Sequence, residues 1–259
     1  MNGGGSMYID AQPYPMNRRE ARSAGGGSMY IDAQPYQWPF DGDLRPENTA
    51  LMIIDMQTDF VGKGGFVDRM GYDISLTAAA IEPTRRVLSA ARSVDGLMII
   101  HTREGHRPDL SDLHENKLWR SKQCGAEIGG EGGAGRILVR GEKGWDIVPE
   151  LYPEKGEIII DKPGKGAFWA TDLDQILIKG HIRNIIFAGV TTDCCVSTTL
   201  RDANDRGYEC ITLSDCTAAT IYENHLSTLS TIKTSYGLFG CVTDSAAVIE
   251  AFGKMPAKK

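Results

Sequence analysis

Short apolar runs alternate with amphipathic segments along most of this chain. The apolar runs are nearly continuous, which is typical of strands buried on both faces of a parallel sheet. The segments between them repeat apolar residues at helical spacing. We expect strands at 50–56, 96–102, 156–162, 184–190 and 208–215. We expect helices at 82–93, 171–179 and 195–206.

Strands that alternate with helices predict parallel pairing and right-handed crossovers. The predicted fold class is therefore α/β, a doubly wound parallel-sheet sandwich in a single domain. The interval 103–155 is polar and rich in glycine around 125–135. A segment of this length in a compact domain is usually a lid or an interface element, and the sequence leaves both open.

The N-terminus contains a perfect repeat. GGGSMYIDAQPY occupies residues 3–14 and again residues 25–36. A single duplicated segment led by GGGS resembles a linker or fusion remnant more than a repeat fold. We expect residues 1–28 to be a disordered linker and residues 29–259 to form the folded domain. An arm exchanged between subunits is the alternative.

Composition and charge exclude several kinds of partner. The chain has 259 residues, 41% of them hydrophobic, which suits one full-sized core. Its formal net charge is -6, so it lacks the basic stripe that nucleic-acid binding needs. It has neither the roughly 18 apolar residues of a membrane span nor a signal-peptide pattern. We expect a cytoplasmic protein whose partner is a small-molecule substrate, with no nucleic acid and no membrane.

Cofactor motifs are also missing from the sequence. The six cysteines form no disulfide framework and include no CxxC pair. Without CxxC or HExxH a zinc site has little support. No GxGxxG follows a predicted strand and no GxxxxGK[ST] occurs, so a nucleotide site is unsupported. We expect no cofactor.

Three reactive side chains stand at the ends of predicted strands. Asp55 ends the first strand, Lys162 ends the strand at 156–162, and Cys195 follows the strand at 184–190. Ligands bind beyond the carboxyl ends of parallel strands, so these side chains should meet. A thiol at a helix start beside an ammonium ionises more easily, and a carboxylate can accept its proton.

Each of the three residues also has an ordinary structural explanation. A cysteine after a strand is usually a buried core thiol. An aspartate in an apolar strand is often a cap or one half of an ion pair, and a lysine at a strand exit is usually solvated. The combination of all three is what favours a catalytic site.

The sequence around these residues resembles the isochorismatase-like cysteine hydrolases. AGVTTDCCV at 188–196 is similar to their nucleophile segment, IIDMQTDF at 53–60 to their aspartate motif, and DKPGKGAF at 161–168 to their lysine segment. The resemblance spans about residues 37–252. Within that superfamily, biuret and triuret hydrolases share the longer stretches DMQTDF-GKGG-VD-MGYD, HTREGHRPDL, RILVRGE-GWDI-PELYP and TTLRDANDRGYEC.

The resemblance implies a role for each catalytic residue and a fold, that of the isochorismatase-like hydrolases. Asp55 would be the general base and later the general acid, and Lys162 the electrostatic partner. Cys195 would be the nucleophile rather than Cys194, because Cys195 directly precedes Val196.

The resemblance also implies contacts with the substrate. The Val190–Thr191 peptide would be cis, and the amides of Thr191 and Cys195 would form an oxyanion hole. Lys165 is a candidate to donate a hydrogen bond to a substrate carbonyl. Phe60 is a candidate substrate contact, although core or lid packing would explain an aromatic residue there equally well.

Nicotinamidases of this superfamily hold a metal with an Asp-x-His motif. No such motif occurs between residues 62 and 118. We therefore expect no metal, and nicotinamide becomes a less favoured substrate.

The predicted reaction cleaves a terminal C–N bond of a small linear ureide through a thioester-type intermediate and releases ammonia. Biuret hydrolases carry a glutamine in a late helix where this chain reads KTSYG at 233–237. The shorter Ser235 would leave room for one more urea unit, and Tyr236 would add a polar group. This favours triuret, giving carboxybiuret, over biuret, giving allophanate; a ureidoacrylate-type activity comes next.

Two other classes of function stay open. A catalytically inactive scaffold relative would not need the triad. A thiol redox protein could use the neighbouring Cys194 and Cys195, although such a pair lacks CxxC spacing. From the resemblance we also expect a homo-oligomer, a tetramer or a dimer.

Overall fold

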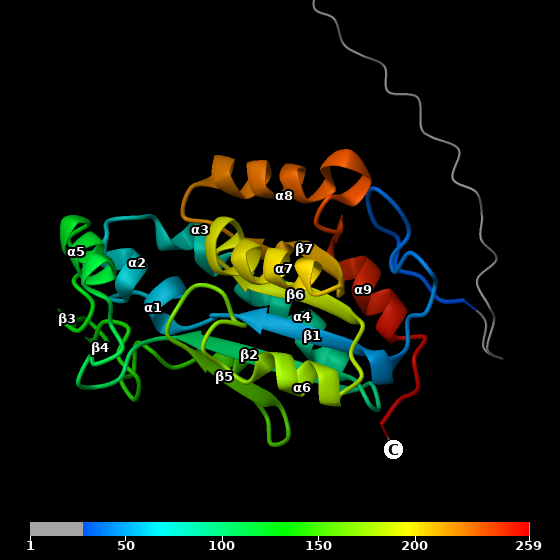
Figure 1. Ribbon diagram of the computed structural model, residues 1–259, viewed down its shortest axis with the longest axis horizontal. Coiled ribbons are helices and arrows are strands. Elements are labelled where there is room, and N and C mark those ends of the chain that lie inside the picture. The colour runs from blue at the N-terminus through cyan, green and yellow to red at the C-terminus, as the bar shows by residue number, and fades with distance from the viewer. Residues whose placement is uncertain (1–27, 259) are drawn as a thin grey trace, which may run out of the picture.

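A six-stranded parallel sheet forms the centre of this computed structural model, which describes residues 28–258. The strand order is β5-β2-β1-β6-β7-β8, and every neighbouring pair is parallel (Figure 1). The strands are β1 (Thr49–Ile54), β2 (Met98–Glu104), β5 (Ile158–Lys162), β6 (Asn184–Val190), β7 (Glu209–Ala218) and β8 (Cys241–Thr243). A small antiparallel pair, β3 (Glu131–Gly132) and β4 (Gly135–Arg136), stands apart from it.

Helices connect the strands and cover both faces of the sheet. The α-helices are α1 (Thr58–Val61), α2 (Phe66–Arg69), α3 (Ile74–Ala78), α4 (Ile81–Arg92), α5 (Glu115–Gln123), α6 (Leu173–Lys179), α7 (Ser197–Asp205), α8 (Tyr222–Gly237) and α9 (Ser245–Phe252). Short 3₁₀ turns lie at Pro46–Asn48 and Pro149–Leu151, and a π-helical turn at Thr192–Val196.

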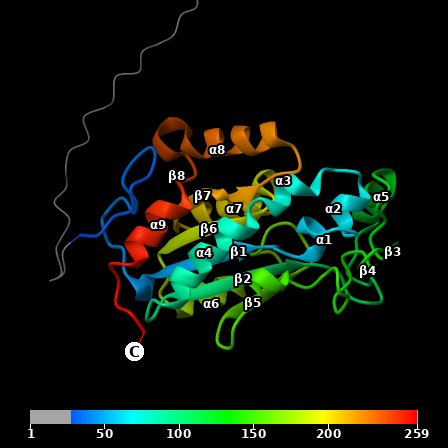
Figure 2. The ribbon, with the colours of Figure 1, turned by 180° about the vertical axis from the view of Figure 1, so that it is seen from behind.

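The two faces of β1 belong to two separate hydrophobic clusters. Leu51 and Ile53 belong to the cluster that includes the buried residues of α4 and α9, which Figure 2 shows in front of the sheet. Met52 and Ile54 belong to the cluster that includes the buried residues of α6, α7 and α8. Successive strand side chains point to opposite faces, so a continuously apolar strand can fill both cores.

The predicted fold class is confirmed. The predicted helix 82–93 corresponds to α4, and the strand at 184–190 has the predicted bounds. The strand predicted at 96–102 begins and ends two residues later, at Met98–Glu104. This shift matters because it puts Glu104 at the carboxyl end of β2.

The linker prediction for residues 1–28 lies outside the described residues, except for Ser28. Residues 28–36, the described part of the second copy of the repeat, belong to the fold. Ile31 is only 1% exposed, and the backbones of Gln34 and Val242 exchange hydrogen bonds of 2.9 and 2.8 Å. This antiparallel bridge lies against β8 at the edge of the sheet.

Helices α1, α2 and α5 gather beyond the carboxyl ends of the strands, at the left of Figure 1. The long interval 103–155 therefore returns over the strand ends of its own chain, and α5 lies within it. Among residues 28–258, none of the helices has the length and apolar character that crossing a membrane requires.

Candidate active site

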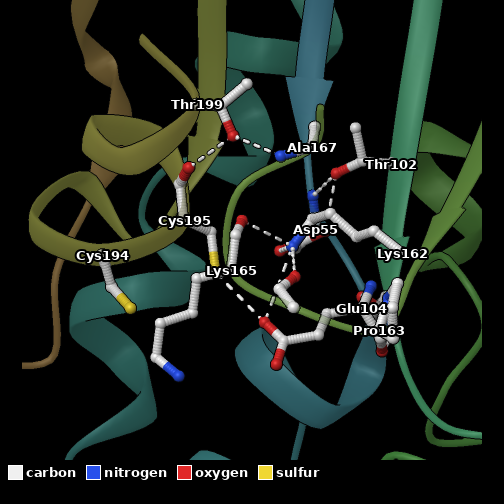
Figure 3. Close-up of polar contacts among 12 residues, drawn as sticks. Asp55, Thr102, Glu104, Lys162, Pro163, Lys165, Ala167, Cys194, Cys195 and Thr199 are labelled. Carbon is white, nitrogen blue, oxygen red and sulfur yellow. Dashed lines mark hydrogen bonds and ion pairs between the residues drawn. The ribbon is translucent and has the colours of Figure 1, made fainter. Parts of the chain in front are cut away.

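Four reactive side chains meet at the carboxyl edge of the sheet (Figure 3). Asp55 follows β1, Glu104 ends β2 and Lys162 ends β5. Glu104 and Lys162 are register partners in the parallel pair. Cys195 lies in the π-helical turn that follows β6. The three residues predicted as a triad are thus brought together, with a fourth beside them.

Lys162 is held in place by three neighbours. Its Nζ lies 2.7 Å from Asp55 Oδ2, and both side chains are fully buried. It also donates hydrogen bonds of 2.9 Å to the carbonyls of Gly164 and Lys165. Burial alone would lower the pKa of Lys162, but the negative charge of Asp55 raises it above its ordinary value. The ammonium therefore stays charged.

Asp55 is able to take up a proton. Burial raises its pKa, although the attraction of Lys162 opposes this. Oδ1 accepts a hydrogen bond of 2.6 Å from Thr102 Oγ1. Oδ2 faces the Lys162 ammonium at 2.7 Å. The raised pKa makes this carboxylate a better proton acceptor than an exposed aspartate.

The Cys195 thiol is a buried hydrogen-bond donor. The residue is 4% exposed, and Sγ lies 3.3 Å from Glu104 Oε2. The hydrogen bond with Cys194 and burial raise the pKa of the Cys195 thiol well above its ordinary value. The resting sulfur therefore carries a proton, and a nearby base must remove it before the sulfur can act as a nucleophile.

The sequence reasoning missed Glu104. Its Oε1 lies 2.5 Å from Lys117 Nζ, and its Oε2 lies 3.5 Å from Lys162 Nζ. Burial alone would raise the pKa of Glu104, but Lys162 and Lys117 lower it to about 2. This carboxylate stays ionised. The strand-end rule that identified Asp55 would have identified it too, had the predicted strand not ended two residues early.

The Cys195 thiol faces a cavity of about 280 Å³. Four of the predicted substrate or nucleophile residues line it: Phe60, Lys165, Thr191 and Cys195. Another side of the cavity is lined by Lys117, Arg120 and Ser121 of helix α5 and by Cys124, which caps that helix. Part of the interval 103–155 thus covers the site within one chain.

Ser235 and Tyr236, the predicted substrate contacts on α8, do not line this cavity within the chain. Helix α8 has 16 residues and begins near the nucleophile turn, where His225 contacts Thr192. A helix advances about 1.5 Å per residue, so the kink at Ser235 and Tyr236, where the backbone turns left-handed, lies roughly 15 Å from His225. There Tyr236 is 64% exposed and stacks on Tyr36 at 5.7 Å between ring centroids.

The Val190–Thr191 peptide is cis, as the resemblance implies. Cys194 and Cys195 carry free thiols. Ligand atoms of Asp55, Glu104 and Cys195 lie within 4.8 Å of one another, a spacing at which such groups could hold a metal. Here the Lys162 ammonium already supplies a positive charge, close to both carboxylates.

The isochorismatase domain matches residues 49–247 of this chain, a span that contains all four reactive residues. The chain belongs to the isochorismatase family. Ureidoacrylate amidohydrolase RutB from Acinetobacter baylyi is 31% identical over 220 residues, 81% of this chain and 85% of that protein. The enzyme of the same name from Serratia proteamaculans is 33% identical over 180 residues, 66% of this chain and 70% of that protein.

Solved structures agree with the family assignment. A cysteine hydrolase from Pseudomonas syringae pv. phaseolicola superposes with a TM-score of 0.69 at 28% identity, covering 86% of this chain and 97% of that one. This member of the isochorismatase family is an amidohydrolase, a hydrolase of amide C–N bonds. The prediction of an isochorismatase-like cysteine hydrolase is confirmed.

Proposed function

We propose that this amidohydrolase releases ammonia from the end of a small linear ureide, with Cys195 as nucleophile and triuret as the preferred substrate. One observation carries the reaction type. A buried thiol that lines the cavity has behind it a carboxylate with a raised pKa, which is paired with a permanently charged ammonium. Such a set supplies a nucleophile, a base and charge stabilisation.

The first half of the reaction forms an acyl enzyme. The Asp55 carboxylate takes the thiol proton of Cys195, and the Lys162 ammonium stabilises the thiolate. Sγ bonds to the terminal carbonyl carbon of the ureide, and the amides of Thr191 and Cys195 hold the oxyanion. The terminal C–N bond then breaks, and Asp55 returns its proton to the departing nitrogen, which leaves as ammonia.

The second half hydrolyses the acyl enzyme. Asp55, ionised again, removes a proton from a water molecule that attacks the carbonyl bonded to Sγ. The S–C bond breaks and the thiol is regenerated by the proton that Asp55 holds. With triuret the product is carboxybiuret, and Lys165 at the cavity wall is positioned to donate to a remote carbonyl.

The choice of a biuret- or triuret-type ureide depends on the stretches that resemble biuret and triuret hydrolases. Three of them line the cavity. The first contributes Phe60, Val67, Met70 and Tyr72, the second Glu104 and the third Leu138. Similarity at the cavity wall bears on substrate choice more directly than similarity in the core, because these side chains face the ligand. Ser235 does not line this cavity within the chain, so triuret over biuret is the part of the proposal that ammonia release has to test.

Ureidoacrylate is the second candidate, and a specific observation favours it. Arg120 and Lys165 both line the cavity and are exposed, and neither forms an ion pair within residues 28–258. A carboxylate at the far end of a substrate could pair with them. The 31–33% identity to ureidoacrylate amidohydrolases supports the same alternative.

Ammonia release from triuret, biuret, ureidoacrylate and nicotinamide tests the proposal, with the native chain and Cys195→Ser measured in parallel. We expect triuret to have the highest kcat/KM and the variant to release none. Preference for biuret or ureidoacrylate would keep the mechanism and reject the substrate. No ammonia from any ureide would reject the function.

A further inference from the structure

Glu104 is a second carboxylate at the nucleophile, and the reaction described above gives it no task. Its side chain is 5% exposed, and its Oε2 lies 3.3 Å from Cys195 Sγ. Figure 3 shows Glu104 and Thr199 on opposite sides of the Cys195 sulfur. Lys117 and Lys162 pair its charge, and its hydrogen bond with Sγ puts Oε2 beside the reacting atom.

The two carboxylates at Cys195 differ in what they can do. Burial raises the pKa of Asp55, and Lys162 and Lys117 bring the pKa of Glu104 down to about 2. Asp55 can hold a proton during the reaction, whereas Glu104 remains an anion that only accepts hydrogen bonds. Proton transfer therefore falls to Asp55.

The hydrogen bonds of Glu104 change when Cys195 loses its thiol proton. In the resting site Oε2 accepts the S–H of Cys195, and Oε1 is occupied by Lys117. Once Asp55 has taken that proton, Oε2 faces a thiolate and its nearest cation is Lys162 at 3.5 Å. Oε2 then needs a new donor at this spot.

The terminal amino group of a ureide is such a donor. Its nitrogen is bonded to the carbon that Sγ attacks, so it comes next to the sulfur and to Oε2. We propose that Glu104 Oε2 accepts an N–H of the substrate's terminal amino group and so determines specificity for an unsubstituted –NH₂ end. This role rests on the proposed function, since it requires a ureide as substrate.

The hydrogen bond also orients the leaving group. With one N–H directed at Oε2, the nitrogen lone pair is free to receive the proton from Asp55 as the C–N bond breaks. No atom is transferred to or from Glu104. A site built to pair with an N–H discriminates strongly against groups that lack one, because its buried acceptor is then left unpaired.

Glu104→Gln separates this role from that of a general base, by two measurements. The first is kcat/KM for ammonia release. The second is the rate at which methyl methanethiosulfonate, which carries no N–H, modifies Cys195 at neutral pH, read by peptide mass spectrometry. Asp55, Glu104, Lys162 and Cys194 all face the thiol. Removing only the negative charge of Glu104 favours the thiolate.

We expect Glu104→Gln to lower kcat/KM for the ureide about 10- to 100-fold, the range for a lost hydrogen bond to a charged group. The rate of Cys195 modification in this variant should equal or exceed that of the native chain. Asp55→Asn should lower both kcat/KM and the rate of Cys195 modification. A ureide whose terminal nitrogen is methylated should have a low kcat/KM with the native chain. Glu104→Gln should reduce the difference in kcat/KM between this ureide and the unmethylated one.

Glu157→Gln is the matched control, because Glu157 is also ion-paired but lies at the opposite end of β5. It should change neither measurement, and thermal unfolding should show that every variant folds. If Glu104→Gln lost both turnover and Cys195 modification, the proposed contact between Glu104 and the substrate would be overturned. Unchanged turnover in this variant would overturn it too. If the native chain is modified at Cys195 but releases no ammonia from any ureide, the proposed function itself fails.

Discussion

The Asp55 carboxylate and the Lys162 ammonium lie 2.7 Å apart, and both side chains are fully buried. Withdrawing two charges from water costs free energy that their attraction only partly returns. The pair is therefore poorly explained by stability alone. It fits a site that needs a proton acceptor and a fixed positive charge close to a thiol.

Lys162→Met should destabilise the protein and abolish activity. The variant leaves Asp55 buried without its cation, which typically costs about 3–5 kcal/mol. Urea unfolding at neutral pH measures the loss. The double variant Asp55→Leu/Lys162→Met, with no buried charge left at this pair, should recover much of the stability and none of the turnover. A double variant less stable than Lys162→Met would contradict this explanation.

Cys195→Ser should lower kcat at least ~1000-fold, whereas Cys194→Ser should lower it less than ~10-fold. Of the two thiols, it is that of Cys195 that donates to Glu104 and lies within 4.8 Å of the Asp55 carboxylate. Steady-state ammonia release measures both variants. Equal losses would show that the adjacent thiols share the role.

Stability should fall in acid partly because of Glu157. Burial alone would raise its pKa, but hydrogen bonds from His101 and Arg92 lower it to about 2. An unfolded glutamate titrates near ~4.3, so the unfolded chain binds more protons between these values. The stabilisation is present above about pH 5 and is lost as the pH falls toward about 2.

Glu157→Gln should therefore cost stability at pH 7 and progressively less in acid. We expect a loss of about 1–2 kcal/mol at pH 7, allowing for the partly open surroundings of this ion pair. Urea midpoints measured from pH 7 to pH 3 should converge for the two proteins. A constant difference across that range would mean that the charge of Glu157 is not responsible.

His225→Ala should reduce kcat about 10-fold with a smaller effect on KM. The imidazole Nδ1 lies 2.8 Å from Thr192 Oγ1, and Thr192 begins the turn that carries Cys195. Loss of this buried partner should loosen the turn. His225→Asn offers a polar atom near the Nδ1 position and should restore most of kcat. Failure of that rescue would point to packing against Tyr222 instead.

Removal of residues 1–27 should leave both turnover and the urea midpoint unchanged. The second copy of the repeat supplies Ile31 to the core and Gln34 to the edge strand, so the sheet edge already has its partner. Unfolding and ammonia release of the shortened chain provide the comparison. A drop in either would favour a structural role for the first copy.

The local pattern of apolar residues predicted much of the fold and of the site. Continuously apolar runs such as 184–190 indicated buried parallel strands, and the rule that ligands bind beyond the carboxyl ends of such strands predicted that Asp55, Lys162 and Cys195 meet. The error at β2 was only two residues long, yet it removed Glu104 from consideration. Strand ends are set by tertiary pairing, and the period of the side chains does not mark them.

What the sequence determined by itself was the fold class, the family and the three strand-end residues, because these follow from short-range patterns and contiguous motifs. The tertiary structure decided which side chains share the cavity. It brought Lys117 of α5 onto Glu104 across the strand ends, and it carried Ser235 to the far end of α8. Such contacts depend on the length and direction of the connecting helices, and spacing along the chain does not specify them.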